Sequence, residues 1–248
     1  MAIIRCKDPK HANDELVFNV GLFDTLEEDE WKGDISIGRL EEPGWDSRYE
    51  YEAKIVVAEI KKKDKVSTFL ELGSGPGMLG QKILKEYPDI DYHFIDKKYA
   101  AKYHKDNKLK GKFFVKDMAL DLDTQGLEEK YDFIMANDFL EHVLSPTMIV
   151  QKMMLLSHEN TSVIISVPNW RMGHQFIYKG LFDYDNFIYF MHVHGFESTA
   201  LYGSNMVVGP LEQINQIYPR LDSEESLPEE YLHHWNHYII FKPKQSDI

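Results

Sequence analysis

The feature that most constrains the fold is a regular alternation of short apolar runs and helical patterns between residues 46 and 168. Each run is almost wholly apolar, which is typical of a parallel strand buried on both faces rather than of a half-exposed strand. The segments between the runs show helical spacing. The pattern therefore predicts an α/β fold with helices on both faces of a parallel sheet. The expected strands are 67–72, 91–96, 112–117, 131–138 and 161–168.

Helix signals support the same division of the chain. A helix is expected from Asp46, a plausible N-cap, to the lysines at 61–63, which favour a helix C-terminus. Ser145 and Pro146 have the residue types of an N-cap and a first helical position. After Pro168 the alternation stops in an aromatic-rich stretch, and residues 233–244 indicate one late strand. Further helices are expected at 77–87, 97–106 and 145–158.

Composition narrows the class of protein. With 248 residues and 43% hydrophobic residues, the chain can bury a substantial core. Its single cysteine, Cys6, excludes an internal disulfide framework and suits a reducing cytosol, so a cytoplasmic location is expected. The N-terminus lacks a signal-peptide core, and no apolar run reaches the length of a membrane span. A formal charge of −13 makes nucleic acid an unlikely partner.

A glycine-rich turn follows the first expected strand in the sequence ELGSGPGMLG, residues 71–80. A strand, a glycine turn and a helix together direct backbone N–H groups at one point. A phosphate-binding P-loop needs Gly-Lys-Ser/Thr, whereas the chain has Gly80-Gln81-Lys82. The dinucleotide pattern G-x-G-x-x-G matches Gly75, Gly77 and Gly80, but these residues start too far beyond the strand.

The register that fits the strand is Glu71-x-Gly73-x-Gly75-x-Gly77. With this motif the sequence resembles the class I S-adenosylmethionine (SAM)-dependent methyltransferases over about residues 46–170, and is closest in motif to their small-molecule O-methyltransferases. The resemblance implies a Rossmann-like, mostly parallel, seven-stranded sheet. Its domain would span 46–248, with an extension at 1–45 as a possible lid and an acceptor region at about 169–205. Cofactor contacts are implied for Glu71, Gly73, Ser74, Gly75, Gly77, Asp96, Asp117, Met118 and Asn137.

The individual roles follow from the same resemblance. Glu71 would accept from the cofactor ammonium, Asp96 would hold the ribose hydroxyls and Asp117 the adenine amino group. For Asp96 a plain helix N-cap is the structural alternative, and for Met118 the alternative is core packing. The absence of Asn/Asp-Pro-Pro after the fourth strand disfavours adenine and cytosine N-methylation. The segment DFLEHV after the fourth strand and the later segment GLFDYDNF resemble those of family members that methylate small molecules, and this resemblance implies a small-molecule hydroxyl as the acceptor. A non-catalytic SAM-binding protein, an RNA or protein methyltransferase and an NAD-dependent oxidoreductase remain alternatives.

Two groups of polar residues suggest how an acceptor could be activated. In a helix, Asp138, Glu141 and His142 would share one face. His192 and His194 would point the same way if their segment were extended. Asp138, Glu141, His142 and His192 could then hold Mg²⁺, Mn²⁺ or Zn²⁺. Alternatively His142, His192 or His194 acts as a metal-free base.

Overall fold

The computed structural model describes residues 45–118, 121–168, 178–204 and 236–244. The possible lid at 1–45, apart from Trp45, and residues 169–177 and 205 of the expected acceptor region lie outside the described residues. The first described element is helix α3 (Trp45–Ile60), and the last is strand β7 (Asn236–Pro243). No helix in the described ranges combines the length and the apolar character that crossing a membrane requires.

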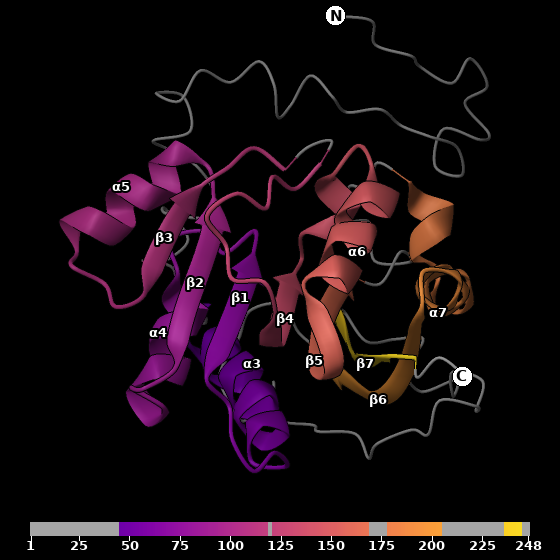
Figure 1. The fold of residues 1–248 in the computed structure, drawn as a ribbon, viewed down its shortest axis with the longest axis horizontal. Helices are drawn as coiled ribbons and strands as arrows, with labels where there is room; N and C mark the ends of the chain where they lie inside the picture. Colours follow the sequence, from indigo (N-terminus) through magenta and orange to yellow (C-terminus); the bar gives the residue numbers. More distant parts are fainter. Residues whose placement is uncertain (1–44, 119–120, 169–177, 205–235, 245–248) are drawn as a thin grey trace, which may run out of the picture.

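Seven strands form a single sheet in the order β3-β2-β1-β4-β5-β7-β6 (Figure 1). The first five are parallel, and β7 lies antiparallel between β5 and β6. The expected Rossmann-like fold is therefore confirmed. The strands are β1 (Thr68–Leu72), β2 (Asp91–Asp96), β3 (Lys112–Val115), β4 (Tyr131–Asn137), β5 (Ser157–Pro168), β6 (Phe196–Ser204) and β7.

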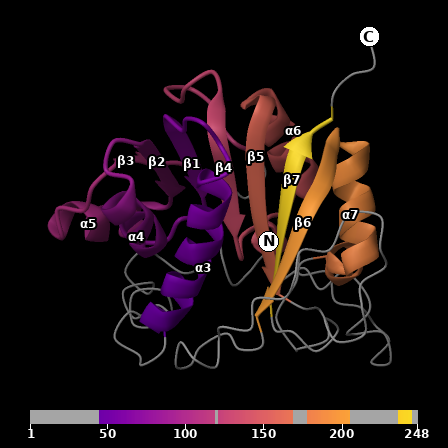
Figure 2. The same ribbon diagram turned by 90° about the horizontal axis from the view of Figure 1, so that it is seen from below.

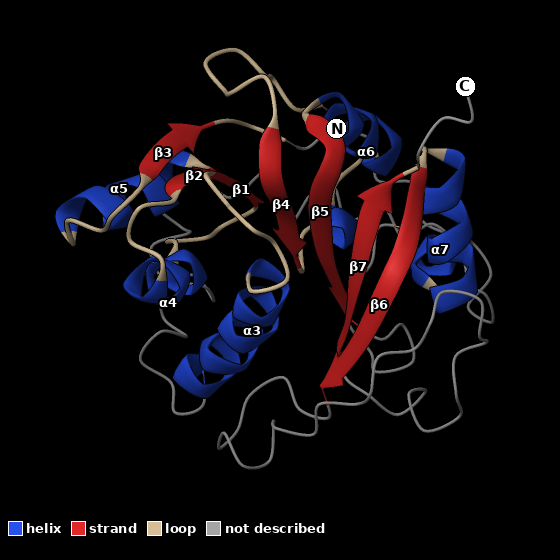
Figure 3. Ribbon diagram, turned by 60° about the horizontal axis from the view of Figure 1, so that its bottom comes forward, coloured by secondary structure: helices blue, strands red, loops and turns tan. Residues whose placement is uncertain are grey.

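Helices cover both faces of the sheet, as the apolar strands require (Figures 2 and 3). On one face α3 and α4 (Met78–Glu86) pack against alternate strand residues such as Phe69 and Phe133. On the other face α6 (Pro146–Leu155) and α7 (Tyr184–Val193) pack against the intervening residues, such as Leu70 and Ile134. The remaining elements are α5 (Lys98–Asp106) and 3₁₀ turns at Leu140–His142 and Lys179–Phe182.

Several expected boundaries differ from the structure in instructive ways. Helix α3 begins at Trp45, so Asp46 lies in the first turn, where it pairs with Lys82 at 2.6 Å. Ser145 is the N-cap of α6 with Pro146 following it, as expected. Strand β5 begins at Ser157, four residues before the expected start, because Ser157 already pairs with Tyr131 before a register shift.

The region around His192 and His194 is helical rather than extended, so the expectation of alternating, co-directed histidines is wrong. His192 lies in the last turn of α7, and His194 occupies its C-cap position. The helix forms because Phe187 and Met191, one turn apart, are both buried in the core. The helix ends at Val193, and Gly195, with a φ of 90°, has the left-handed conformation usual just after a helix.

Candidate functional site

The glycine turn joins the carboxyl end of β1 to the start of α4, at the edge where parallel strands bind ligands in such sheets. Two of its backbone N–H groups, those of Gly73 and Ser74, donate to the carbonyl oxygen of Ile95 at 3.0 and 3.2 Å. The N–H of Gly75 donates to a carboxylate oxygen of Asp96 at 2.6 Å. The turn is therefore held in place by the end of β2.

The two glycines Gly73 and Gly75 are needed in this turn for different physical reasons. At Gly73, with φ of 67°, an added Cβ would lie 2.4 Å from the ring of Phe139. At Gly75, with φ of 52°, an added Cβ would meet no atom of the described residues within 4 Å. At position 73 a side chain is excluded by packing against Phe139. At position 75 the backbone borders space that the described residues do not fill. Gly75 thus forms a cradle for a ligand that approaches the backbone closely.

Asp96 braces this cradle. Its second carboxylate oxygen accepts the N–H of Lys97 at 2.6 Å. The alternative that Asp96 caps the following helix is wrong, because Lys97 occupies the N-cap position of α5. The binding of ribose hydroxyls by Asp96 stays a prediction.

Glu71 lies on β1 and is 2% exposed. The hydroxyl of Tyr92 donates to its carboxyl oxygen at 2.8 Å. Burial raises the pKa of Glu71 to about 8, although the bond from Tyr92 acts in the opposite direction and nearby Glu52 and Asp96 raise it further. The carboxyl is therefore mostly protonated at neutral pH, and an adjacent cation would favour its ionised form.

Replacing Glu71 by glutamine is expected to reduce the loss of stability at alkaline pH. The folded-state pKa of Glu71 lies above the unfolded value, so its contribution is full below about pH 4.3 and is lost as pH rises through about 8. At pH 9 the Tm of the variant should exceed that of the wild type by about 10–20 °C.

Thermal unfolding of both proteins between pH 5 and 9 checks this expectation. Glu197→Gln is the matched control, since the Glu197 side chain is 44% exposed and should leave the pH profile unchanged. Parallel profiles for the wild type and Glu71→Gln would contradict a protonated Glu71 in the folded protein.

A second group of polar residues lies at the carboxyl end of β4, beside the glycine turn. Asp138 accepts from Arg48 of α3 through one oxygen, while the hydroxyl of Ser166 donates to the other at 2.6 Å. Arg48 also pairs with Glu52 at 2.7 Å. The amide nitrogen of Asn137 donates to Glu52 at 3.0 Å. Helix α3 is thereby fastened to the end of β4 by a buried network.

Asn137 also supplies a feature that matters for a ligand. Its side-chain oxygen is buried and accepts no hydrogen bond from the part of the chain that the structure describes. The backbone of β4 pairs with β1 up to Ala136 and Leu72, so Asn137 and Gly73 follow neighbouring positions. A buried acceptor beside an open glycine cradle fits a ligand that carries a donor group such as an ammonium.

The expected metal site is not assembled. Asp138, at a φ of 44°, precedes a 3₁₀ turn of three residues instead of starting a helix, and both of its carboxylate oxygens are engaged by Arg48 and Ser166. Glu141 is fully buried, and burial raises its pKa well above the usual range. His142 stays near Glu141, 3.7 Å from its carboxyl oxygen.

His192 and His194 lie at the other edge of the sheet. They precede β6, whose first residue, Phe196, pairs with Pro243 at the end of β7. The carboxyl end of β5 pairs instead with Asn236, at the start of β7. Within the described ranges, Asp138, Glu141, His142 and His192 do not form a group of converging ligand atoms. Chain direction is the reason: α7 and the turn after it lead away from the glycine turn to the start of β6.

The remaining predicted residues are placed as follows. Asp117 is exposed two residues after β3. Met118 is 5% exposed within the core cluster, which agrees with its structural alternative. Ser74 donates from its hydroxyl to the carbonyl oxygen of Gly75 at 3.2 Å. Arg48 and Glu52 were not among the predicted site residues. The four-residue spacing of Arg48 and Glu52 on a helix is the sequence signal that could have indicated their ion pair, although such pairs are usually on the surface.

Comparison with known proteins identifies the family. A family model described as a methyltransferase domain matches residues 45–202, from α3 to β6. The chain belongs to this methyltransferase family. No curated protein matches its sequence.

Solved structures agree with the methyltransferase fold. A SAM-dependent methyltransferase from Clostridium acetobutylicum is 8% identical, with a TM-score of 0.60 over 87% of this chain and 96% of that one. The methyltransferase CcbJ from Streptomyces caelestis is 12% identical, with a TM-score of 0.58 over 89% and 100%. The plantazolicin methyltransferase BpumL, in complex with a substrate analogue and S-adenosylhomocysteine (SAH), is 13% identical, with a TM-score of 0.57 over 88% and 95%. These low identities establish the fold.

Proposed function

We propose that this methyltransferase transfers the methyl group of SAM to a hydroxyl of a small molecule. The observation that best supports SAM as the cofactor is the open cradle at Gly75, which lies near the acids Glu71 and Asp96. SAM carries a sulfonium and an ammonium against one carboxylate, so an acidic site attracts it. The pyrophosphate of a dinucleotide would give the Glu71 carboxyl no such cationic partner, and the carboxylate of Asp96 would repel it.

Each residue has a proposed role toward this cofactor. The glycine turn accommodates the methionine end, and Glu71 and the buried oxygen of Asn137 favour its positive charge. Asp96 holds the ribose hydroxyls and Asp117 the adenine amino group. Bound SAM supplies an activated methyl group, whose leaving group is a neutral thioether that needs no acid. The protein must therefore position the acceptor and remove its proton.

His142 is the proposed base. It follows β4 at the carboxyl edge of the sheet, and its side chain is 27% exposed, so it can reach an acceptor bound there. His192 and His194 are omitted from the proposal because of their place at the other edge. A small-molecule acceptor is supported by the acidic charge of the chain and by the segment DFLEHV, residues 138–143, which resembles that of family members that methylate small molecules. BpumL, in complex with an analogue of a natural product, shows that the fold can accept such a molecule.

Calorimetric titration with SAM, SAH and NADH tests the cofactor. SAM and SAH are expected to bind with micromolar dissociation constants, because the acidic cradle complements their ammonium group. NADH is expected to give no signal. Binding of NADH with no response to SAM would overturn the proposal.

SAH release in the presence of sugars, phenols and carboxylic acids tests the transfer. At least one hydroxyl compound should increase the release, and His142→Gln should lower its turnover by about 100- to 10,000-fold at unchanged SAM affinity. Turnover of carboxylic acids alone would replace the hydroxyl acceptor with a carboxylate. SAM binding without any turnover would favour a non-catalytic binding protein.

A further inference from the structure

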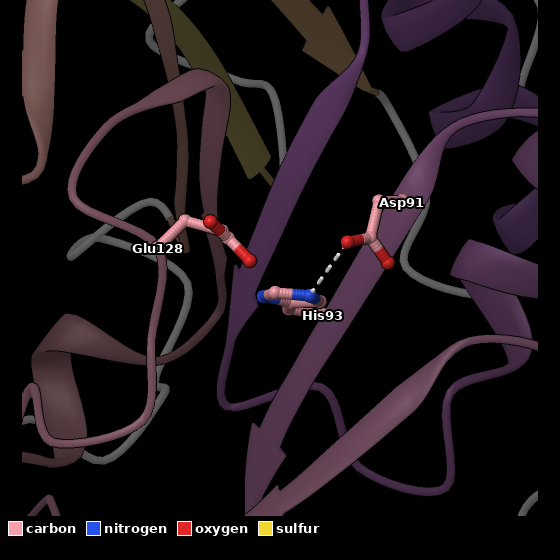
Figure 4. A group of neighbouring side chains, drawn as sticks. All are labelled: Asp91, His93 and Glu128. Carbon is pink, nitrogen blue, oxygen red and sulfur yellow. Dashed lines mark ion pairs between the residues drawn. The ribbon is translucent and has the colours of Figure 1, made fainter.

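Three potential metal ligands gather at the end of β2 that lies away from the glycine turn. Asp91 is the first residue of β2, His93 follows on the same face, and Glu128 approaches from the loop before β4 (Figure 4). One ligand atom from each lies within 4.8 Å of the others. No other group of three His, Cys, Asp or Glu side chains in the described ranges meets in this way.

The buried histidine gives this group its significance. His93 is 1% exposed, and its Nδ1 lies 2.6 Å from the hydroxyl oxygen of Tyr131. Its Nε2 is also buried and makes no hydrogen bond within the described ranges, although it lies 3.3 Å from a carboxylate oxygen of Asp91, with which it could pair as an ion (Figure 4). A buried ring nitrogen without a hydrogen bond is rare in a folded protein and calls for a physical explanation.

The surroundings are compatible with a lone pair on Nε2. The Tyr131 hydroxyl oxygen already accepts the N–H of Glu128 at 3.1 Å, and a hydroxyl oxygen can accept a second bond. If Nδ1 of His93 donates that second bond, Nε2 carries no proton and faces the two carboxylates. Metal-binding histidines commonly donate their other N–H to a fixed oxygen in this manner.

The separation of the His93 and Asp91 ligand atoms suits a small divalent ion, and the Glu128 oxygen lies within 4.8 Å of both. Two ligands bound tetrahedrally at about 2.0–2.1 Å are about 3.3 Å apart. The observed separation between Nε2 of His93 and the Asp91 oxygen is 3.3 Å. An imidazole with two carboxylates is a donor set for Zn²⁺ or Mn²⁺, with water completing the coordination.

We propose that Asp91, His93 and Glu128 form a binding site for a divalent transition-metal ion, with Zn²⁺ as the first candidate. The ion would fasten the loop that carries Glu128 to the start of β2. Asp96, which braces the glycine turn, ends the same strand five residues later, about 16 Å away at 3.3 Å per residue. The site is therefore structural and separate from methyl transfer.

Lys112 provides a sharp test, because it competes for one of the ligands. Its ammonium lies 2.8 Å from the same Asp91 oxygen, and its side chain is 57% exposed, so it can move into solvent. If a metal binds here, it must displace or share this contact. Replacing Lys112 by glutamine should therefore strengthen metal binding. If Asp91, His93 and Lys112 formed only a group of ion pairs and no metal site, the replacement would leave the metal affinity unchanged.

The experiment uses the full chain after chelation and dialysis, titrated calorimetrically with ZnCl₂ and with MnCl₂. One equivalent of Zn²⁺ should bind with a micromolar or lower dissociation constant. At 100 times that constant, Zn²⁺ should raise Tm by about 5–10 °C, because it binds only the folded state.

Variants assign the binding to these residues. Glu128→Gln and Asp91→Asn, both at partly or fully exposed positions, should weaken Zn²⁺ binding at least tenfold, and Lys112→Gln should tighten it. Glu129→Gln is the matched control, because the neighbouring glutamate is exposed and outside the group, so affinity should stay unchanged. The proposal is overturned if neither ion binds, or if Zn²⁺ binds equally well to Glu128→Gln and Asp91→Asn, which would place it on other residues among the 11 histidines.

Discussion

With Gly75 replaced by valine, the protein is expected to lose at least 100-fold in affinity for SAM while it remains folded. An added side chain at this position would meet no protein atom within 4 Å, so it would extend into the space proposed for the cofactor. The φ of 52° adds backbone strain of about 1–2 kcal/mol for a residue other than glycine, which lowers stability without unfolding the domain. Calorimetry gives the affinity, and thermal unfolding gives the stability.

Gly126→Val is the matched control for that strain. Gly126 also has a positive φ, of 82°, with its nearest neighbouring atom at 3.9 Å, and it lies in the loop before β4. This variant should show a similar loss of stability and an unchanged SAM dissociation constant. If Gly75→Val retained SAM affinity within about threefold of the wild type, the cofactor would not approach the backbone at this turn.

Replacing Arg48 by alanine should have the largest effect on stability. The Arg48 side chain is 6% exposed and contacts Glu52, which is fully buried, and Asp138. Removing the cation leaves two carboxylates without their charge partner, and breaking a buried pair in this way costs about 3–5 kcal/mol. For a chain of this size, that corresponds to a fall in Tm of about 6–20 °C.

Lys242→Ala serves as the comparison in the same unfolding experiment. Lys242 pairs with Glu197 at 3.0 Å, but the two side chains are 49% and 44% exposed. An exposed pair of this kind contributes at most about 1 kcal/mol, so Tm should change little. Equal Tm shifts for Arg48→Ala and Lys242→Ala would show that the network around Glu52 does not hold α3 in place.

The parallel half of the fold could be predicted because its signals are local. Apolar runs flanked by helical spacing specify strands such as β1 and β2, and burial on both faces explains why those runs do not alternate. The error at α7 arose because His192 and His194, two residues apart, mimic a strand. Gly195 was the available counter-signal, since a glycine with positive φ commonly follows a helix.

The candidate site could be predicted only in part. The glycine turn and Asp96 belong to one strand–turn–helix unit and its neighbouring strand, so their meeting follows from the expected topology. The pairing of Arg48 with Asp138 joins residues 90 positions apart, and nothing in the local sequence reports it. It depends on how α3 lies across the end of β4, which tertiary packing decides. The same contact removes Asp138 from the metal site that its spacing had indicated.

The position of β7 determines the order in which the strands of the sheet can pair during synthesis. This last described strand lies between β5 and β6, so β6 has no hydrogen-bonding neighbour in the sheet until residues 236–243 have left the ribosome. The hydroxyl of Tyr238 also donates to Glu52 across 186 positions at 3.0 Å, which ties the first described helix to the last described strand. At about 5–20 residues per second, a nascent chain spends several seconds with the edge of β5 uncovered. That edge is an exposed template for pairing with another chain, and among the described strands β7, the last to be made, is the one that covers it.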